Sequence, residues 1–270
     1  MKAYGRTGVV GVIAGALALS AFAAPTARAA DIGIRVSQVV INGGKPIVVG
    51  TTDVKEPPVS FRITLPAGYT TADWSAWDAS PFLYHGTTAA EGAESGGLRM
   101  GYTCYETSLR VADCEGALYI DPRYDLDSNN DATTWKTGVL VQLWKTSGGL
   151  KAEQVMTASG TAQVKRWAKA TVNAGPEPVK KGGTLTVTGG LKRADWVKHS
   201  YTGVAAASVK LQFRKKGTSS YTTVKTVKSS STGALKTTVK ASADGYWRWN
   251  FGGWSTTGTA VTAGDHVDVR

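Results

Sequence analysis

The chain has 270 residues, with 31 Lys and Arg against 20 Asp and Glu, and a formal net charge of +11. Apolar residues make up 42% of it, which is enough for folded cores, and 32 glycines favour short strands joined by tight turns. Two cysteines and three scattered histidines (His85, His199 and His266) argue against a zinc site.

Residues 1–29 have the features of a secretory signal peptide. Lys2 and Arg6 precede an uncharged apolar run from residue 9 to residue 24, and Ala27-Arg28-Ala29 fits a cleavage site. The alternative is a membrane anchor, but the run is shorter than the roughly 20 residues that span a bilayer. No later stretch is long and apolar enough to span one either. We therefore expect a secreted, extracellular protein with no integral membrane segment after cleavage.

Residues 30–170 are predicted to form a β-sandwich-like domain. Val59, Phe61, Ile63 and Leu65 alternate with polar residues, which is typical of a strand with one buried face. No segment has a long helical period. Further predicted strands lie in IGIRVSQVVI, KPIVVGT, LRMGYTC, ALYID and TGVLVQLWK.

Cys104 and Cys114 are predicted to form a disulfide bond. Two nearby cysteines in an exported chain pair in the oxidising environment they enter. Closing so short a loop stabilises the fold by about 2.8 kcal/mol at most.

Residues 171–270 are predicted to form a second, basic domain. Pro176, Pro178 and Gly182-Gly183 mark a new start of the chain, which places the boundary near residue 170. Residues 30–170 carry 13 basic and 15 acidic residues, whereas residues 171–270 carry 15 and 5, a net charge of +10. The positive charge therefore belongs to one domain.

The second domain is predicted to be a run of hairpins. Lys216-Gly217, Thr232-Gly233 and Asp244-Gly245 are turn signals between alternating segments. Trp247 and Trp249 share one face of the last of these segments and are expected in the core. The length and spacing favour an immunoglobulin-like sandwich, without the antibody Cys…Trp…Cys pattern.

Two stretches of this domain resemble a module of secreted actinobacterial proteins. They are TVNAGPEPVKKGGTLTVTGGL and SVKLQFRKKGTSSYTTVKTVKSSSTGALKTTVKASADGYWRWNFGG. The first domain, with GGKPIVVGTT and GYTCYET, is similar to the partners found ahead of that module. The resemblance covers about the last 100 residues and implies an immunoglobulin-like fold. It implies no activity, because the family is largely uncharacterised.

The segment DPRYDLDSNNDATTW is the sharpest polar cluster. Asp125, Asp127, Asn129 and Asp131 stand at alternate positions, as the first calcium ligands of an EF-hand do. Asn130 then replaces the required glycine, and Lys136 stands where a bidentate Glu belongs. A looser Ca²⁺ site and an acidic turn that bonds its own backbone are both open, and no other cofactor is expected.

Trp74 and Trp77 have two interpretations as well. They could stack on sugar rings, as aromatic residues of carbohydrate-binding sandwiches do, or fill the core. No nucleophile motif such as Gly-x-Ser-x-Gly occurs, so we expect a protein that is not an enzyme, with a hydrolase of unrecognised site as the alternative.

Five basic residues of the second domain alternate with apolar ones and are expected on the solvent face of adjacent strands: Lys210, Arg214, Lys225, Lys236 and Lys240. Together with Lys215 and Lys216 they are the candidate contacts for an anionic polymer. Such a face either keeps sheet edges apart or contacts an anionic cell-wall polymer or polysaccharide. Export makes nucleic acid a poor partner. The sequence therefore predicts a monomeric binding or adhesion protein of the cell envelope or extracellular matrix.

Overall fold

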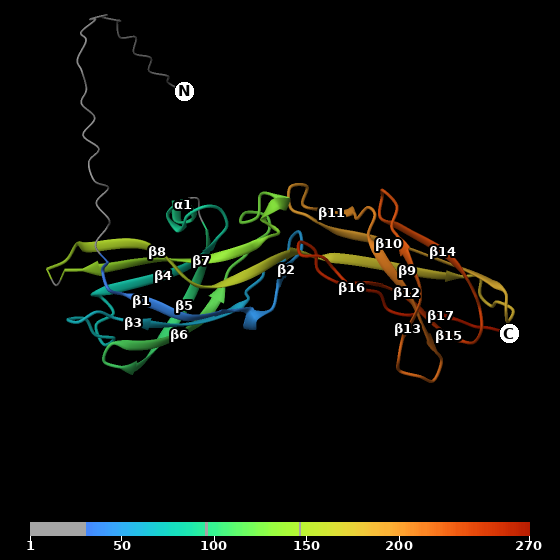
Figure 1. Cartoon of the computed structure of the whole chain (residues 1–270), viewed down its shortest axis with the longest axis horizontal. Coiled ribbons are helices and arrows are strands. Elements are labelled where there is room, and N and C mark those ends of the chain that lie inside the picture. The colour runs from blue at the N-terminus through green and yellow to red at the C-terminus, as the bar shows by residue number, and fades with distance from the viewer. Residues whose placement is uncertain (1–30, 95–96, 146) are drawn as a thin grey trace, which may run out of the picture. The chain divides into compact units, whose positions relative to one another are not determined.

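Strands form nearly all of the regular structure (Figure 1). The computed structural model describes residues 31–270 except 95, 96 and 146, and the predicted signal peptide lies outside this range. In the described part, one helical turn, α1 (Ala89–Glu94), and two 3-10 turns, η1 (Asn42–Gly44) and η2 (Asn129–Asp131), accompany the strands. None of its helices has the length and apolar character needed to cross a membrane. The all-β prediction is confirmed.

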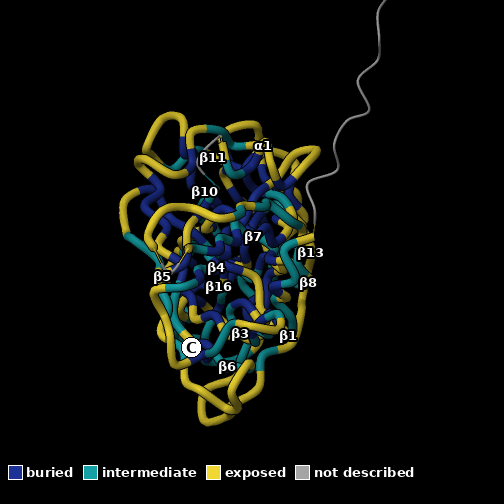
Figure 2. Tube along the Cα trace, turned by 90° about the vertical axis from the view of Figure 1, so that its left-hand side faces the viewer, coloured by how far each residue is buried: buried dark blue, intermediate teal, exposed yellow. Residues whose placement is uncertain are grey.

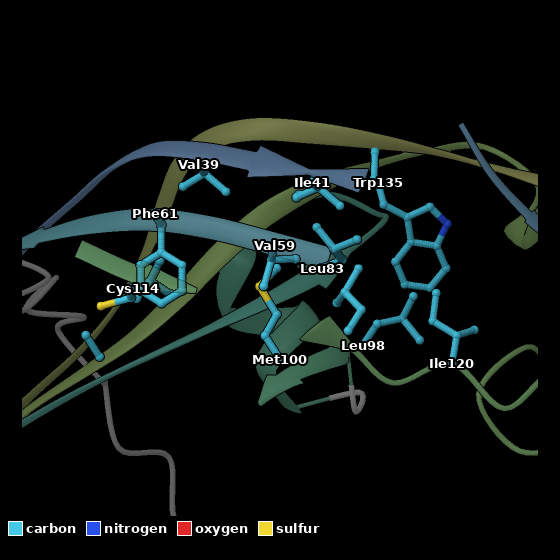
Figure 3. Packing of buried hydrophobic residues seen from close by; sticks show 14 of the residues in the cluster. Val39, Ile41, Val59, Phe61, Leu83, Leu98, Met100, Cys114, Ile120 and Trp135 are labelled. Carbon is cyan, nitrogen blue, oxygen red and sulfur yellow. The ribbon is translucent and has the colours of Figure 1, made fainter. Parts of the chain in front are cut away.

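The first half of the chain folds one sheet around one core. Its strands are β1 (Arg35–Ile41), β2 (Ile47–Val49), β3 (Pro58–Thr64), β4 (Trp77–Tyr84), β5 (Leu98–Ser108), β6 (Val111–Leu118), β7 (Thr134–Trp144) and β8 (Leu150–Arg166). The order β1-β3-β6-β5 corresponds to A-B-E-D of an immunoglobulin-like sandwich, and β4-β7-β8 corresponds to C-F-G. Only two residue pairs join β4 to β5. Apolar side chains from both parts meet between them (Figure 3).

Strand β4 was not expected from the sequence. Pro81 breaks the strand pattern, because proline has no N–H for a ladder hydrogen bond. In the structure β4 pairs with β5 only at Phe82 and Leu83, so position 81 has no partner in β5, and it lies opposite Val139 of β7. Phe82 and Tyr84 are buried under α1, and Gly138 leaves the room that the Phe82 ring occupies.

The second half is a two-sheet sandwich. Its strands are β9 (Ala168–Gly175), β10 (Thr184–Asp195), β11 (Ser200–Gly203), β12 (Ser208–Lys215), β13 (Thr222–Lys228), β14 (Ala234–Lys240), β15 (Gly245–Phe251), β16 (Ala260–Val261) and β17 (Asp265–Val267). One sheet contains β9, β11 and β14 around β10, and the other contains β13, β12 and β15 with β16 and β17. Lettered along the chain, this is the A-B-E and C′-C-F-G arrangement of the immunoglobulin-like class.

Two of the three predicted hairpins are wrong. Lys216-Gly217 does join the paired strands β12 and β13, but Thr232-Gly233 leads from β13 to β14, which lies in the other sheet. Asp244-Gly245 leads back from β14 to β15. The turn residues were recognised correctly, but here they turn the chain from one sheet to the other.

The core of the second sandwich agrees with the sequence. Trp247, Trp249 and Phe251 are all buried, as their shared strand face predicts. The indole N–H of Trp249 on β15 donates to the Thr188 carbonyl on β10, 3.0 Å away, and so links the two sheets. Figure 2 shows the buried segments gathered inside and the exposed ones along the outside.

The chain passes from the first core to the second near the end of β8. Val164 belongs to the first core and Ala168 to the second, so the change falls at the end of β8, a few residues before position 170. Trp196, from the β10–β11 connection, lies fully buried in the first core, and its indole N–H donates to the Gly50 carbonyl at 2.8 Å. Residues 32–270 accordingly form one compact unit.

Candidate functional site

The seven basic residues predicted to contact an anionic polymer lie on two different sheets. Strand β12 carries Lys210, Arg214 and Lys215, and Lys216 follows it in the loop to β13. Lys236 and Lys240 lie on β14, opposite Thr188 and Thr184 of β10. The single basic face is therefore wrong, because the Thr232-Gly233 turn leads the chain across the sandwich.

Lys225 is also separated from the face that carries Arg214. It pairs with Leu211, whose buried side chain points into the sandwich, and opposite residues of an antiparallel pair lie on one side of the sheet. In the described strand pairing β13 bonds only to β12 and forms an edge of its sheet. An inward-directed lysine on an edge strand discourages pairing with other chains.

The outer face of the β13-β12-β15 sheet carries a stack of arginine and tyrosine side chains, which we call the Arg–Tyr stack (Arg214, Tyr221, Tyr246 and Arg248). The Arg248 guanidinium carbon lies 3.7 Å from the Tyr221 ring centre. That of Arg214 lies 4.1 Å from the Tyr246 ring centre and 5.3 Å from that of Tyr221. Guanidinium groups are attracted to aromatic faces by the ring quadrupole, so the stack orients both cations.

Hydrogen bonds fix the two guanidinium groups further. Arg248 Nε donates to Gln212 Oε1 at 2.9 Å, and Gln212 is only 9% exposed. Asn250 Nδ2 donates to the same oxygen at 3.3 Å. Arg214 Nη1 donates to the Thr218 carbonyl at 2.6 Å. Each guanidinium is thus held at one edge, and the structure gives its other N–H groups no partner among the described residues.

Tyr221 reaches across the sheet because Gly264 leaves room for it. A Cβ added at Gly264 would lie 2.2 Å from the Tyr221 hydroxyl oxygen and 2.9 Å from Tyr246 Cβ. Gly264 lies between β16 and β17, whereas Tyr221 directly precedes β13, at the opposite edge of the sheet. Only the folded sheet brings these two residues together, and nothing in the sequence indicated their contact.

No carboxylate neutralises the stack. In the described residues from 168 onward, Arg270 is the only cation in an ion pair, with Asp268. The other ion pairs that the structure gives all involve residues before 140. The positive charge of the second sandwich is thus open to external anions.

The opposite outer face is arranged differently. Lys236 and Lys240 on β14 are both exposed. Lys240 Nζ donates to the Thr184 hydroxyl at 3.2 Å, and none of the cation–aromatic contacts of the structure involves either lysine. This face holds Lys240 by one threonine hydroxyl and Lys169 by the Tyr201 ring, whose centre lies 3.9 Å from Nζ, and the structure gives no arginine stacked on a tyrosine on its described strands.

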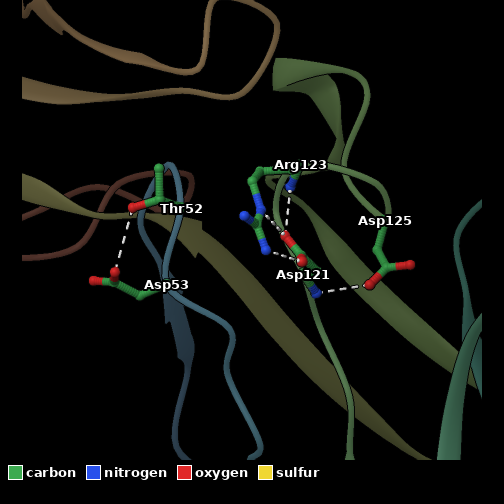
Figure 4. Close-up of polar contacts among 5 residues, drawn as sticks. All are labelled: Thr52, Asp53, Asp121, Arg123 and Asp125. Carbon is green, nitrogen blue, oxygen red and sulfur yellow. Dashed lines mark hydrogen bonds and ion pairs between the residues drawn. The ribbon is translucent and has the colours of Figure 1, made fainter.

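The acidic loop forms turns that bond their own backbone. Figure 4 shows Asp125 accepting from the Asp121 backbone N–H, and Asp121 accepting from the backbone and guanidinium of Arg123. The side-chain hydrogen bonds from Arg123 hold the pKa of Asp121 at about 2. Both carboxylates are therefore used inside the loop, as the acidic-turn interpretation predicts.

The predicted calcium ligands come together only in part: Asp125, Asp127 and Asp131 line one pocket with His85, whereas Asn129 points elsewhere. Asn129 turns toward the β10–β11 connection, where it accepts from Trp196 N and donates to Asp195. Asp131 is buried, accepts from Ser128 N, and lies 3.2 Å from His85 Nε2. Burial raises the pKa of the Asp131 carboxyl. Among the described residues no three Asp, Glu, His or Cys side chains form a metal-binding group, so the calcium geometry with Asp125 and Asp127 is not assembled.

The two tryptophans of the predicted sugar site have different environments. Trp77 is 4% exposed and its indole N–H donates to the Thr70 carbonyl, so it is a core residue without a free face. Trp74 is 47% exposed, with its ring centre 5.0 Å from that of Trp77. The paired stacking surface is therefore wrong, and the core interpretation holds for Trp77.

The predicted disulfide is confirmed. Cys104 on β5 and Cys114 on β6 are directly opposite in the ladder and are bonded. The bond joins neighbouring strands of one sheet, unlike the inter-sheet bond of antibody domains. It is consistent with an extracellular protein.

Comparisons with known proteins give a likeness in fold only. No family model matches the chain, and no curated protein matches it. Among solved structures, the three-domain ectodomain of mouse nectin-like molecule 4 is 11% identical with a TM-score of 0.24. The alignment covers 86% of this chain and 63% of that one. The chain thus spans less than two thirds of that ectodomain.

Two bacterial structures are similar at the same level. Fibronectin(III)-like modules of Clostridium thermocellum CbhA are 11% identical, with a TM-score of 0.28 and coverage of 86% of this chain and 92% of that one. The D0-D1 domain of intimin is 12% identical, with a TM-score of 0.25 and coverage of 86% and 98%. These scores are too low to carry an argument, and the fold assignment rests on the strand order. The origin among actinobacterial proteins stays a prediction.

Proposed function

We propose that the protein is an extracellular, non-enzymatic binding protein that attaches to anionic polymers of the cell envelope or matrix. The contact surface is the outer face of the β13-β12-β15 sheet. Arg214 and Arg248 provide the contacts, and Lys210, which lies on the same face as Arg214, adds charge. This surface replaces the larger set of seven residues expected from the sequence.

The observation that carries the proposal is the order of the Arg–Tyr stack. Arginine side chains on a solvated sheet are usually free to rotate and lose entropy when they bind. Here tyrosine rings and Gln212 already hold the guanidinium groups. The remaining N–H groups match carboxylate or phosphate oxygens in a two-bond geometry.

The distribution of charge supports the same proposal. Residues 171–270 have a net charge of +10, and the stack contains no ion pair. Uncompensated cations on a surface attract anionic ligands and speed their encounter. The calcium-dependent alternative lacks an assembled ligand set in the described residues. The hydrolase alternative has no particular observation in its favour.

Co-sedimentation with purified Gram-positive cell walls tests the proposal. Protein comprising residues 30–270 is mixed with walls at low and at high salt. We expect it to pellet at low salt and to be released at high salt, because salt screens contacts between exposed charges.

Two matched variants make the test specific. Arg214→Glu/Arg248→Glu and Lys236→Glu/Lys240→Glu change the net charge equally but act on opposite faces. We expect the first to abolish pelleting and the second to retain most of it. No pelleting of the parent protein at low salt, or equal loss in both variants, would contradict the assignment to the stack. Circular dichroism checks that both variants are folded.

A further inference from the structure

A groove lies at one end of the first sandwich, away from the Arg–Tyr stack. The β3–β4 connection (residues 65–76) forms one wall, and Trp144, Lys145, Ser147 and Lys151 at the ends of β7 and β8 line the other. Its volume is about 800 Å³, which is within the range of sites that hold small organic ligands.

The wall of the groove formed by residues 65–76 is fixed by buried hydrogen bonds. Thr71 is fully buried, and both its hydroxyl and its backbone N–H bond to carbonyls of the β5–β6 turn. The indole of Trp77 bonds the Thr70 carbonyl at 3.1 Å. The backbone N–H of Trp144 donates to the Ala76 carbonyl at 2.9 Å, which ties the two walls together. This wall is therefore in place before any ligand enters the groove, and binding does not have to order it.

Two aromatic side chains, Tyr69 and Trp144, line the groove. Both are half-buried, so each has an exposed part. The Trp144 indole N–H has no hydrogen-bond partner among the described residues. Aromatic side chains with a polar atom suit ligands that are apolar on one face and polar at the rim. Sugar rings have this character, because their C–H groups form faces and their hydroxyls point outward.

The charged groups of the groove indicate the charge of the sugar that it would bind. Lys151 Nζ lies 3.0 Å from the Tyr69 hydroxyl, which positions its ammonium group, and Lys145 lines the same groove. Asp73 Oδ1 accepts both the backbone N–H and the hydroxyl of Ser75. Its Oδ2 has no partner among the described residues and is able to accept a hydrogen bond from a ligand hydroxyl. Two ammonium groups against one carboxylate favour a ligand that carries a negative charge.

From this combination we infer that the groove binds a short acidic saccharide whose carboxylates face Lys145 and Lys151. Tyr69 and Trp144 contact the ring faces, and Asp73 Oδ2 accepts from a hydroxyl. This site is separate from the Arg–Tyr stack and does not depend on the function proposed for it.

Titration of ¹⁵N-labelled protein with tetragalacturonate, followed by NMR, tests the inference. We expect the Trp144 indole signal and backbone signals of residues 69–76 to shift in a saturable way. Cellotetraose, which has the same number of rings but no charge, should bind more weakly. A chain that binds both equally, or shows no shift up to about 5 mM ligand, contradicts the inference.

Matched variants separate this groove from the basic sheet. Lys145→Ala/Lys151→Ala should weaken tetragalacturonate binding about five- to tenfold, as expected when two partly exposed ion pairs are lost. Lys180→Ala/Lys181→Ala removes the same charge from an exposed loop of the second sandwich and should leave affinity unchanged. Arg214→Glu/Arg248→Glu should also leave the Trp144 shift intact. Loss of the shift in either control would mean that general charge, and not the groove, binds the ligand.

Discussion

The two outer faces of the second sandwich both carry positive charge, but only one of them stacks arginines on tyrosines in the described residues. On the β13-β12-β15 face, arginines are stacked on tyrosines and bonded to Gln212. On the β14 face, Lys236 and Lys240 project beside threonines. A count of charges treats the two faces alike, whereas a binding surface requires donors of fixed direction. The difference identifies which face is the better candidate.

The largest effect is a loss of stability, expected on removing Trp249, which links the two sheets of the second sandwich. Trp249→Ala removes a fully buried ring and the bond from β15 to the Thr188 carbonyl on β10. We expect the free energy of unfolding to fall by about 3–5 kcal/mol in urea denaturation. Trp254→Ala removes an indole that is 40% exposed and should change stability by under about 1 kcal/mol. Equal losses in the two variants would show that Trp249 does not link the sheets.

Substitutions that keep the charge sharpen the comparison of the two faces. Arg248→Lys retains the cation but loses the planar group over Tyr221 and the bond to Gln212. We expect about fivefold weaker binding to cell walls, since such contacts contribute about 1 kcal/mol. Lys236→Arg on the other face should leave binding unchanged. Wall affinity that follows net charge alone, with both variants equal to the parent protein, would contradict an ordered stack.

Much of the fold follows from local patterns. Alternation and turn residues predict the strands around Val59 and Leu211 and the buried face of Trp247, because each depends on neighbours along the chain. Which sheet the next strand joins after a turn depends on packing between the two sheets. Thr232-Gly233 has the residues of a hairpin turn and yet connects two sheets. The misplacement of Lys236 and Lys240 is a direct result.

The candidate site was predictable only in part. Arg214 and Lys210 were predicted as surface cations, since strand alternation places them outside. The roles of Tyr221 and Arg248 were missed, because they depend on the order of β13, β12 and β15 and on Gly264. The spacing of Asp125 and Asp131 resembles a metal loop, but the structure directs these carboxylates to backbone N–H groups. Residue spacing specifies where ligands stand along the chain, not where their oxygens point.

A smaller effect is expected from disturbing the stack without touching a charge. Gly264→Ala places a methyl group within 2.2 Å of the Tyr221 hydroxyl and must displace that ring. We expect two- to threefold weaker wall binding and about 1 kcal/mol lower stability, as in other overpacked sites. Gly252→Ala is the matched control, because its added methyl group has nothing within 4 Å. Unchanged binding in Gly264→Ala would mean that Tyr221 does not orient the arginines.

The smallest effect is expected in the pH dependence of stability, which extends the comparison to the two halves of the chain. The first sandwich pairs Asp121 with Arg123 and Asp113 with Arg62, whereas the stack has no carboxylate at all. The side-chain hydrogen bond from Arg62 lowers the pKa of Asp113, and the pKa of Asp121 is about 2. An unfolded aspartate has a pKa of about 3.9, so the folded state binds fewer protons than the unfolded state in this window. The stabilisation is therefore complete above about pH 4 and is lost as the pH falls toward 2.

We expect the melting temperature of Asp113→Asn/Asp121→Asn to fall less steeply than that of the parent protein between pH 4 and pH 2. Parallel curves would mean that the two ion pairs contribute nothing measurable, as is found for many surface ion pairs.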